Sequence, residues 1–175
     1  MNEEDPIATS KQLKTCLVGE NIGLLTDAGC PNIADPGAKL ILHAHENNIN
    51  VIPLVGPSSI LLAMMSSGLN GNNFSFNGYL PIDKSERSKK IRKLEIHSKN
   101  YNQSQIFIET PYRNQLLFDE LKKNLNKSTF LCVATNIGST NQKIKTMQIK
   151  EWKSKKIIIE KEPTIFIFHS DLIIF

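Results

Sequence analysis

The sequence predicts an α/β protein of two domains. Two short apolar runs, residues 22–26 and 50–55, each lead into a loop of glycine, proline and small polar residues, a pattern typical of buried strands in such proteins. Residues 38–45 between them have helical character, so the three segments predict a β-α-β unit. In the second half, strand-like runs again alternate with helix-like stretches, which predicts an α/β domain with a mixed sheet.

The first predicted domain covers residues 1–73 and is partial. A helix over residues 6–20 begins at a proline, a residue suited to a first helical turn. Asp35 is predicted to cap the helix of the β-α-β unit, and a third helix follows at residues 60–67. The turn sequence Asn-Gly-Asn-Asn at residues 70–73 is the predicted linker.

The second predicted domain, residues 74–175, holds both helices and strands. Residues 143–149 alternate as a solvent-faced strand does, and residues 163–169 are apolar enough for a buried strand. The predicted strands are residues 74–79, 105–109, 129–135, 143–149 and 163–169, and the predicted helices are residues 84–97 and 114–124.

Composition excludes several classes of protein. Hydrophobic residues make up 40% of the chain, and no apolar run approaches the roughly 20 residues of a membrane span. Three scattered cysteines are too few for a disulfide framework or a zinc site, so a reducing, cytoplasmic location and no metal are expected. The net charge of +4 divides into −4 for residues 1–75 and +8 for residues 76–175. The basic half indicates either a polyanionic partner or solubility alone.

Two carboxylates end predicted strands and are candidate catalytic groups. Asp27 follows the first strand and Glu109 ends the strand at residues 105–109, and ligands of open α/β sheets bind at the carboxyl ends of strands. The alternative for Asp27 is a role in its turn. The alternative for Glu109 is an ion pair with Arg113, four residues later. The residues alone leave these alternatives open.

Two further segments suit anionic ligands. The sequence Gly-Pro-Ser-Ser at residues 56–59 opens a helix, where free N–H groups and hydroxyls fit a carboxylate, ribose or phosphate, although an ordinary capped helix is an equal alternative. A basic segment begins at Lys84 and is either a solvated helix face or a phosphate-binding surface. Its members are Lys84, Arg87, Lys89, Lys90, Arg92 and Lys93.

Three motifs in order resemble one family. Residues 27–37, D-A-G-C-P-N-I-A-D-P-G, resemble the D-A-G-x-P-x-I-x-D-P-G motif of the tetrapyrrole methylase superfamily. Residues 55–59, V-G-P-S-S, look like the P-G-P-[ST]-A segment of its branch of ribosomal RNA small subunit methyltransferases of type I, the cytidine 2′-O-methyltransferases. Residues 108–113, I-E-T-P-Y-R, resemble the Y-E-S-P-H-R of that branch. The resemblance covers residues 13–168.

The resemblance implies a fold, a cofactor and a substrate. The fold is two α/β domains with S-adenosyl-L-methionine in the cleft between them, and homodimers are common in such a family. The reaction is methylation of a ribose 2′-hydroxyl in small-subunit ribosomal RNA, for which we take Asp27 or Glu109 as the general base. Basic side chains, among them Lys84, Arg87 and Arg113, would bind the RNA. The implied cofactor residues are Cys30, Pro31, Ile33, Ser58, Ser59, Glu109, Thr110, Ala134, Pro163 and Thr164.

The chain departs from the family in two places. After the strand at residues 129–135 the branch reads R-E-L-T-K, whereas residues 135–139 read T-N-I-G-S and lack the charges that favour an RNA substrate. Family members begin with a strand and a glycine- and proline-rich loop that form one wall of the cofactor pocket. Nothing before Pro6 supplies them, so we expect an N-terminally truncated chain. Two alternatives therefore accompany the RNA enzyme: a small-molecule methyltransferase, and an inactive domain that is no enzyme.

Overall fold

The computed structural model describes residues 18–171, and the chain divides into two compact units, residues 1–58 and 59–175. The sequence places the boundary after residue 73. In the structure helix α3, Ser59–Ser67, packs on the sheet of the second unit, so the division falls before Ser59. The helix predicted at residues 6–20 lies almost entirely outside the described residues.

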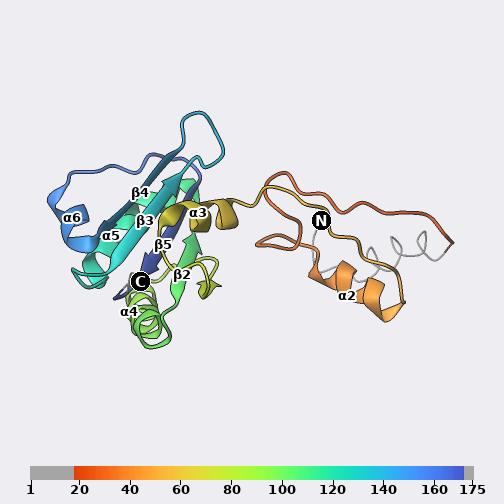
Figure 1. Cartoon of the computed structure of the whole chain (residues 1–175), viewed down its shortest axis with the longest axis horizontal. Helices are drawn as coiled ribbons and strands as arrows, with labels where there is room; N and C mark the ends of the chain where they lie inside the picture. The colour runs from red at the N-terminus through yellow and green to blue at the C-terminus, as the bar shows by residue number, and fades with distance from the viewer. Residues whose placement is uncertain (1–17, 172–175) are drawn as a thin grey trace. The chain divides into compact units, whose positions relative to one another are not determined.

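The second unit is built on a five-stranded mixed sheet with the order β1-β2-β5-β3-β4 (Figure 1). β1 and β2 are parallel, and the other neighbouring strands are antiparallel. The predicted mixed sheet is therefore confirmed, with β1 shorter than expected. The strands are β1 Phe74–Phe76, β2 Ser104–Ile108, β3 Phe130–Thr135, β4 Lys143–Gln148 and β5 Thr164–His169.

Helices cover both faces of this sheet because its central strands are apolar on both sides. In β5, Ile165 and Ile167 face a core that includes Ile60 and Met64 of α3, whereas Phe166 and Phe168 face a larger core formed with the remaining helices. Successive side chains of a strand point to opposite faces, so one strand serves both cores. The remaining helices are α4 Lys84–Tyr101, the short 3-10 helix η1 Pro111–Arg113, α5 Asn114–Asn124 and α6 Ile149–Ser154.

The six-residue helix α6 was not predicted from the sequence. It follows β4 without a loop, and a capping box closes its N-terminus. In this box the Gln148 side chain accepts a hydrogen bond from the backbone N–H of Glu151, and the Glu151 side chain accepts one from the backbone N–H of Gln148. Trp152 of α6 is buried, and its indole N–H donates to the carbonyl of Leu131 at 2.9 Å. The predicted last residue of β4, Ile149, is consequently the first residue of a helix.

The first unit contains one described helix, α2 Ala38–Glu46, as predicted. Leu40 and Ala44 of α2 form a small core with Leu24 and Val51 packed against it. The two strands predicted at residues 22–26 and 50–55 are wrong: both segments are irregular in the structure. The physical reason is that a strand needs a hydrogen-bonded neighbour, and neither segment pairs with another strand within the described residues 18–171.

The start of α2 differs from the predicted cap. The N-cap residue is Gly37, with a φ of 148° and no side-chain hydrogen bond, so the capping role predicted for Asp35 is wrong. A Cβ atom at Gly37 would lie 3.0 Å from the Cδ2 atom of Leu24. The loop needs glycine here because the backbone turns with a positive φ against a packed side chain.

Candidate functional site

One end of the sheet of the second unit gathers the candidate residues of that unit. β1, β2 and β3 finish at this end and β4 and β5 begin there, because Ile108 pairs with Ile165, and Thr135 pairs with both Thr164 and Lys143. We call it the site end of the sheet. The candidate residues in or beside its loops are Glu109, Thr110, Arg113, Ala134, Pro163 and Thr164.

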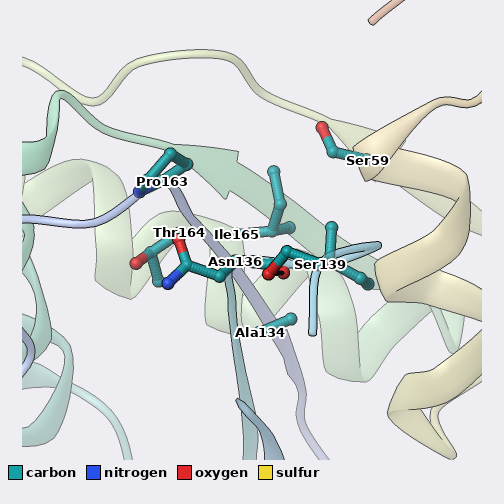
Figure 2. Close-up of a pocket in the computed structure, with 8 residues that line it drawn as sticks. Ser59, Ala134, Asn136, Ser139, Pro163, Thr164 and Ile165 are labelled. Carbon is teal, nitrogen blue, oxygen red and sulfur yellow. Dashed lines mark hydrogen bonds between the residues drawn. The ribbon is translucent and has the colours of Figure 1, made fainter. Parts of the chain in front are cut away.

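A pocket of about 250 Å³ opens at the site end. Figure 2 shows its labelled side chains, which come from the start of α3, the end of β3 with its following loop, and the start of β5. The structure thus brings together four of the predicted cofactor residues: Ser59, Ala134, Pro163 and Thr164. Complete ligand pockets are commonly about 300–1,000 Å³, so this one suits one end of a nucleoside-sized ligand.

Hydrogen bonds fix the pocket walls. The N–H of Asn136 donates to the carbonyl of Pro163 at 2.9 Å, which ties the loop after β3 to the start of β5. The hydroxyl of Thr164 donates to the carbonyl of Glu162 at 2.9 Å, and the Oγ1 atoms of Thr164 and Thr135 lie 3.3 Å apart. An ordered wall can select a ligand because little conformational entropy is lost on binding.

Sequence reasoning missed half of the pocket: Asn136, Ile137, Ser139 and Ile165. The first three occupy the segment that departs from the R-E-L-T-K pattern. Together with Ala134, the two isoleucines give the pocket an apolar lining, and Ser59 and Asn136 add a hydroxyl and an amide. This donor set fits the adenosyl end of S-adenosylmethionine. The turn-rich sequence after a buried strand was the signal that could have identified these residues.

Glu109 forms the ion pair that was its alternative interpretation. Its side chain is only 6% exposed, and its Oε1 atom lies 2.8 Å from an Nη2 atom of Arg113, which is 25% exposed. The same Oε1 accepts hydrogen bonds from the Nε of Arg113 at 3.0 Å, from the backbone N–H of Thr110 at 2.8 Å and from its hydroxyl at 3.3 Å. Glu109 therefore orders the turn that follows β2.

In the first unit, the two motif loops meet each other. The Sγ atom of Cys30 lies 3.7 Å from the carbonyl oxygen of Pro57, within the distance of a weak S–H···O bond. Asp27 and Ile33 are exposed, Pro31 and Ser58 are half-buried, and Ser58 is the last residue of this unit. Within residues 27–37, the N–H of Ile33 donates to the carbonyl of Cys30 at 3.2 Å and closes a tight turn.

The predicted RNA-binding residues differ in their surroundings. Lys84 is exposed and available to a phosphate. Arg87 is buried, and its Nη1 atom donates to the carbonyls of Pro81 at 3.2 Å and Ile82 at 2.8 Å. Arg87 is therefore not on the surface, as a phosphate-binding role would require; it supports the loop before α4 from inside, through the two carbonyls that its Nη1 atom bonds.

Two further ionisable side chains of the second unit, Cys132 and His169, are buried. Burial raises the pKa of the Cys132 thiol, against a hydrogen bond with Thr146 that lowers it, so Cys132 is a core residue. Burial also lowers the pKa of His169. Within residues 18–171, no cluster of His, Cys, Asp and Glu could hold a metal ion, and no helix is long and apolar enough to cross a membrane.

Known proteins resemble this chain in sequence and in fold. Ribosomal RNA small subunit methyltransferase I of Vibrio cholerae is 33% identical over 135 residues, which are 77% of this chain and 46% of that protein. Its counterpart in Synechocystis is 33% identical over 129 residues, which are 74% of this chain and 45% of that protein. The chain thus spans about half the length of these curated relatives. No family model matches it.

Solved structures share the fold at low sequence identity. Diphthine synthase has a TM-score of 0.62 at 14% identity, covering 97% of this chain and 68% of that one. The methyltransferase CobJ has a TM-score of 0.60 at 15% identity, covering 93% and 70%. Uroporphyrin-III C-methyl transferase from Thermus thermophilus, complexed with S-adenyl homocysteine, has a TM-score of 0.54 at 12% identity, covering 96% and 74%.

These similarities agree with the resemblance carried by the three motifs and confirm the type of fold that it implied. The chain is thus similar in sequence to ribosomal RNA small subunit methyltransferase I over about half the length of those proteins, and it shares the fold of solved methyltransferases.

Proposed function

We propose that this chain is part of an S-adenosylmethionine-dependent methyltransferase that modifies a ribose 2′-hydroxyl of small-subunit ribosomal RNA. The observation that carries the proposal is the pocket at the site end. Ser59, Ala134, Pro163 and Thr164 line it together although they come from three separate parts of the chain. The 33% identity to ribosomal RNA small subunit methyltransferase I supports the substrate class.

In this proposal the pocket holds the adenosyl end of the cofactor. The apolar lining residues Ala134, Ile137 and Ile165 pack against the base, and Ser59 and Asn136 supply polar groups. When bound, the cofactor supplies a methyl group on a sulfonium sulfur. The protein would align the two reactants, because much of the rate acceleration comes from holding the acceptor oxygen in line with the methyl group.

Asp27 and Glu109 are the two candidates for accepting the proton of the ribose hydroxyl. The contacts suggest different roles, since Glu109 is engaged by Thr110 and Arg113, whereas Asp27 is exposed. We propose Asp27 as the base and Glu109 as the group that positions the turn after β2. Asp27→Asn should then abolish most turnover with cofactor binding intact, and unchanged turnover would remove Asp27 from the mechanism.

The charge of the second unit supports an RNA partner. Residues 59–175 hold 18 basic and 10 acidic side chains, a net charge of +8. Basic side chains that bind RNA phosphates release the counterions condensed on the RNA, so affinity should fall steeply as salt is raised. Binding that is insensitive to salt between about 50 and 200 mM would contradict this part of the proposal.

Titration calorimetry tests the cofactor site. Ser59 is exposed at the pocket wall, so Ser59→Trp should block the pocket without disturbing a core, and S-adenosylmethionine binding should be lost. Ser66→Trp on the same helix is the matched control, since Ser66 is exposed and does not line the pocket. Equal binding by both variants would refute the assignment, and no heat with the unaltered chain would favour the inactive domain.

A further inference from the structure

Two exposed tyrosines stand on neighbouring loops at the site end. Tyr79 follows β1 and is 56% exposed, and Tyr112 lies in η1 after β2 and is 68% exposed. β1 and β2 are parallel neighbours, and the N–H of Ile108 donates to the carbonyl of Gly78 at 3.1 Å. The two loops therefore leave the sheet side by side.

Both loops are ordered by hydrogen bonds from their own unit. Arg87 holds the loop of Tyr79 through the carbonyls of Pro81 and Ile82. In the loop of Tyr112, the N–H of Arg113 donates to the carbonyl of Thr110 at 2.9 Å. The tyrosine rings are thus exposed on a fixed scaffold, which is the state in which an aromatic ring binds a partner at low entropic cost.

Tyr112 is also paired with a cation. The guanidinium of Arg113 lies 5.4 Å from the centroid of the Tyr112 ring, and Glu109 fixes that guanidinium through contacts of 2.8 and 3.0 Å. Aromatic rings and guanidinium planes are the groups on which unpaired RNA bases stack. The +8 charge of the unit suits the phosphates that would accompany those bases.

The tyrosine loops and the pocket share one end of one sheet. β2, which precedes Tyr112, pairs with β5, whose first residues Thr164 and Ile165 line the pocket. A methyl acceptor must be held beside the cofactor in a defined orientation. A surface that grips bases at this end would present the neighbouring ribose to the pocket region.

We propose that Tyr79 and Tyr112 form a base-stacking platform for an unpaired stretch of the RNA substrate. The proposal rests on the proposed function for the identity of the RNA as substrate. It adds the form of RNA that is recognised: nucleotides outside a duplex, because only these present the face of a base to a ring.

The test is fluorescence anisotropy of the full chain with a labelled single-stranded RNA of about 10 nucleotides. Tyr79→Ala and Tyr112→Ala should each weaken binding by about 5- to 100-fold, as loss of one stacked base does. The Phe variants at both positions should bind as the unaltered chain does. The dependence of affinity on salt should keep its slope, because no phosphate contact is removed.

Tyr101→Ala is the matched control. Tyr101 is 61% exposed in the same unit, but it ends α4 just before β2 begins, at the opposite end of the sheet. Its loss should leave RNA affinity unchanged. A fully paired RNA of the same length should bind all of these variants equally, because its bases are not open to stacking.

Three results would overturn the platform: no RNA binding by the unaltered chain, full affinity in the Tyr79 and Tyr112 alanine variants, or an equal loss in the Phe variants, which would indicate hydroxyl contacts. Cofactor titration by calorimetry separates this proposal from the proposed function. If the unaltered chain binds the cofactor but its RNA affinity does not depend on Tyr79 and Tyr112, the platform alone is refuted. If RNA affinity depends on the two tyrosines but the unaltered chain does not bind the cofactor, the methyltransferase proposal alone is refuted. An unchanged fluorescence spectrum of the buried Trp152 in each variant verifies that the unit is folded.

Discussion

Replacing Arg113 with methionine should destabilise the second unit by leaving Glu109 buried without its partner. The variant loses the Nη2 contact at 2.8 Å and the Nε hydrogen bond at 3.0 Å. Removing one member of a buried pair costs about 3–5 kcal/mol. Arg113 is 25% exposed and Glu109 keeps its bonds from Thr110, so we expect a smaller loss than for a fully buried pair, about 2–3 kcal/mol.

Urea unfolding monitored by tryptophan fluorescence measures this loss. Trp152 is the single tryptophan of the chain, and its ring packs edge-on against Phe118 of the same unit, with 5.2 Å between the ring centroids. The signal therefore reports on the second unit, which matters because two compact units need not unfold in one transition.

A control and a double variant make the result decisive. Lys89→Met removes an exposed pair with Glu86 at 2.9 Å and should cost less than about 1 kcal/mol. The double variant Glu109→Leu/Arg113→Met should lose less unfolding free energy than the two single variants lose together, by at least about 1 kcal/mol, because it leaves no buried charge unpaired. An Arg113→Met chain as stable as Lys89→Met would refute the reasoning.

Three further predictions follow from the contacts of the second unit. Arg87→Met should lower the unfolding free energy by about 1–3 kcal/mol, because two carbonyls lose their donor. Lys90→Met, at an exposed position of the same helix, should leave it unchanged, and equal urea midpoints for the two variants would contradict this prediction. Burial lowers the pKa of His169 in the folded chain, so the unfolded chain binds this proton more readily and the free energy of unfolding should fall as pH drops below 6.5. In urea titrations at pH 7 and pH 5, His169→Gln should reduce the difference in stability between the two pH values. Because burial raises the pKa of Cys132, a thiol reagent at pH 8 should modify it only after urea unfolding, as peptide mapping by mass spectrometry would show; rapid modification of the native chain would be inconsistent with its burial.

The sequence predicted the second unit well because its signals are local. α5 begins and ends at the predicted residues. The strands around Phe107, Val133 and Phe166 are apolar on both faces, which identifies them without knowledge of their neighbours. α6 was missed because six residues after a strand carry too little periodicity to distinguish a helix from a longer strand.

The first unit and the side-chain roles depend on contacts that a sequence does not contain. Residues 22–26 and 50–55 have strand-like composition, but strand structure requires a paired neighbour. Arg87 reads as one cation among several, and only its burial beneath Pro81 and Ile82 separates it from the exposed Lys84. Glu109 had two equal interpretations until its 2.8 Å contact with Arg113 was known.

Methyl transfer to isolated small-subunit ribosomal RNA tests the central claim most directly. The chain would be incubated with S-adenosylmethionine labelled in its methyl group, and the RNA then hydrolysed with alkali. A 2′-O-methylated ribose cannot assist cleavage of its own linkage, so the account predicts labelled dinucleotides that survive hydrolysis. The label should disappear in the Ser59→Trp variant and persist in Ser66→Trp. The account would be contradicted if the label appeared in mononucleotides released by alkali, or if the chain bound the cofactor but transferred no methyl group to the RNA.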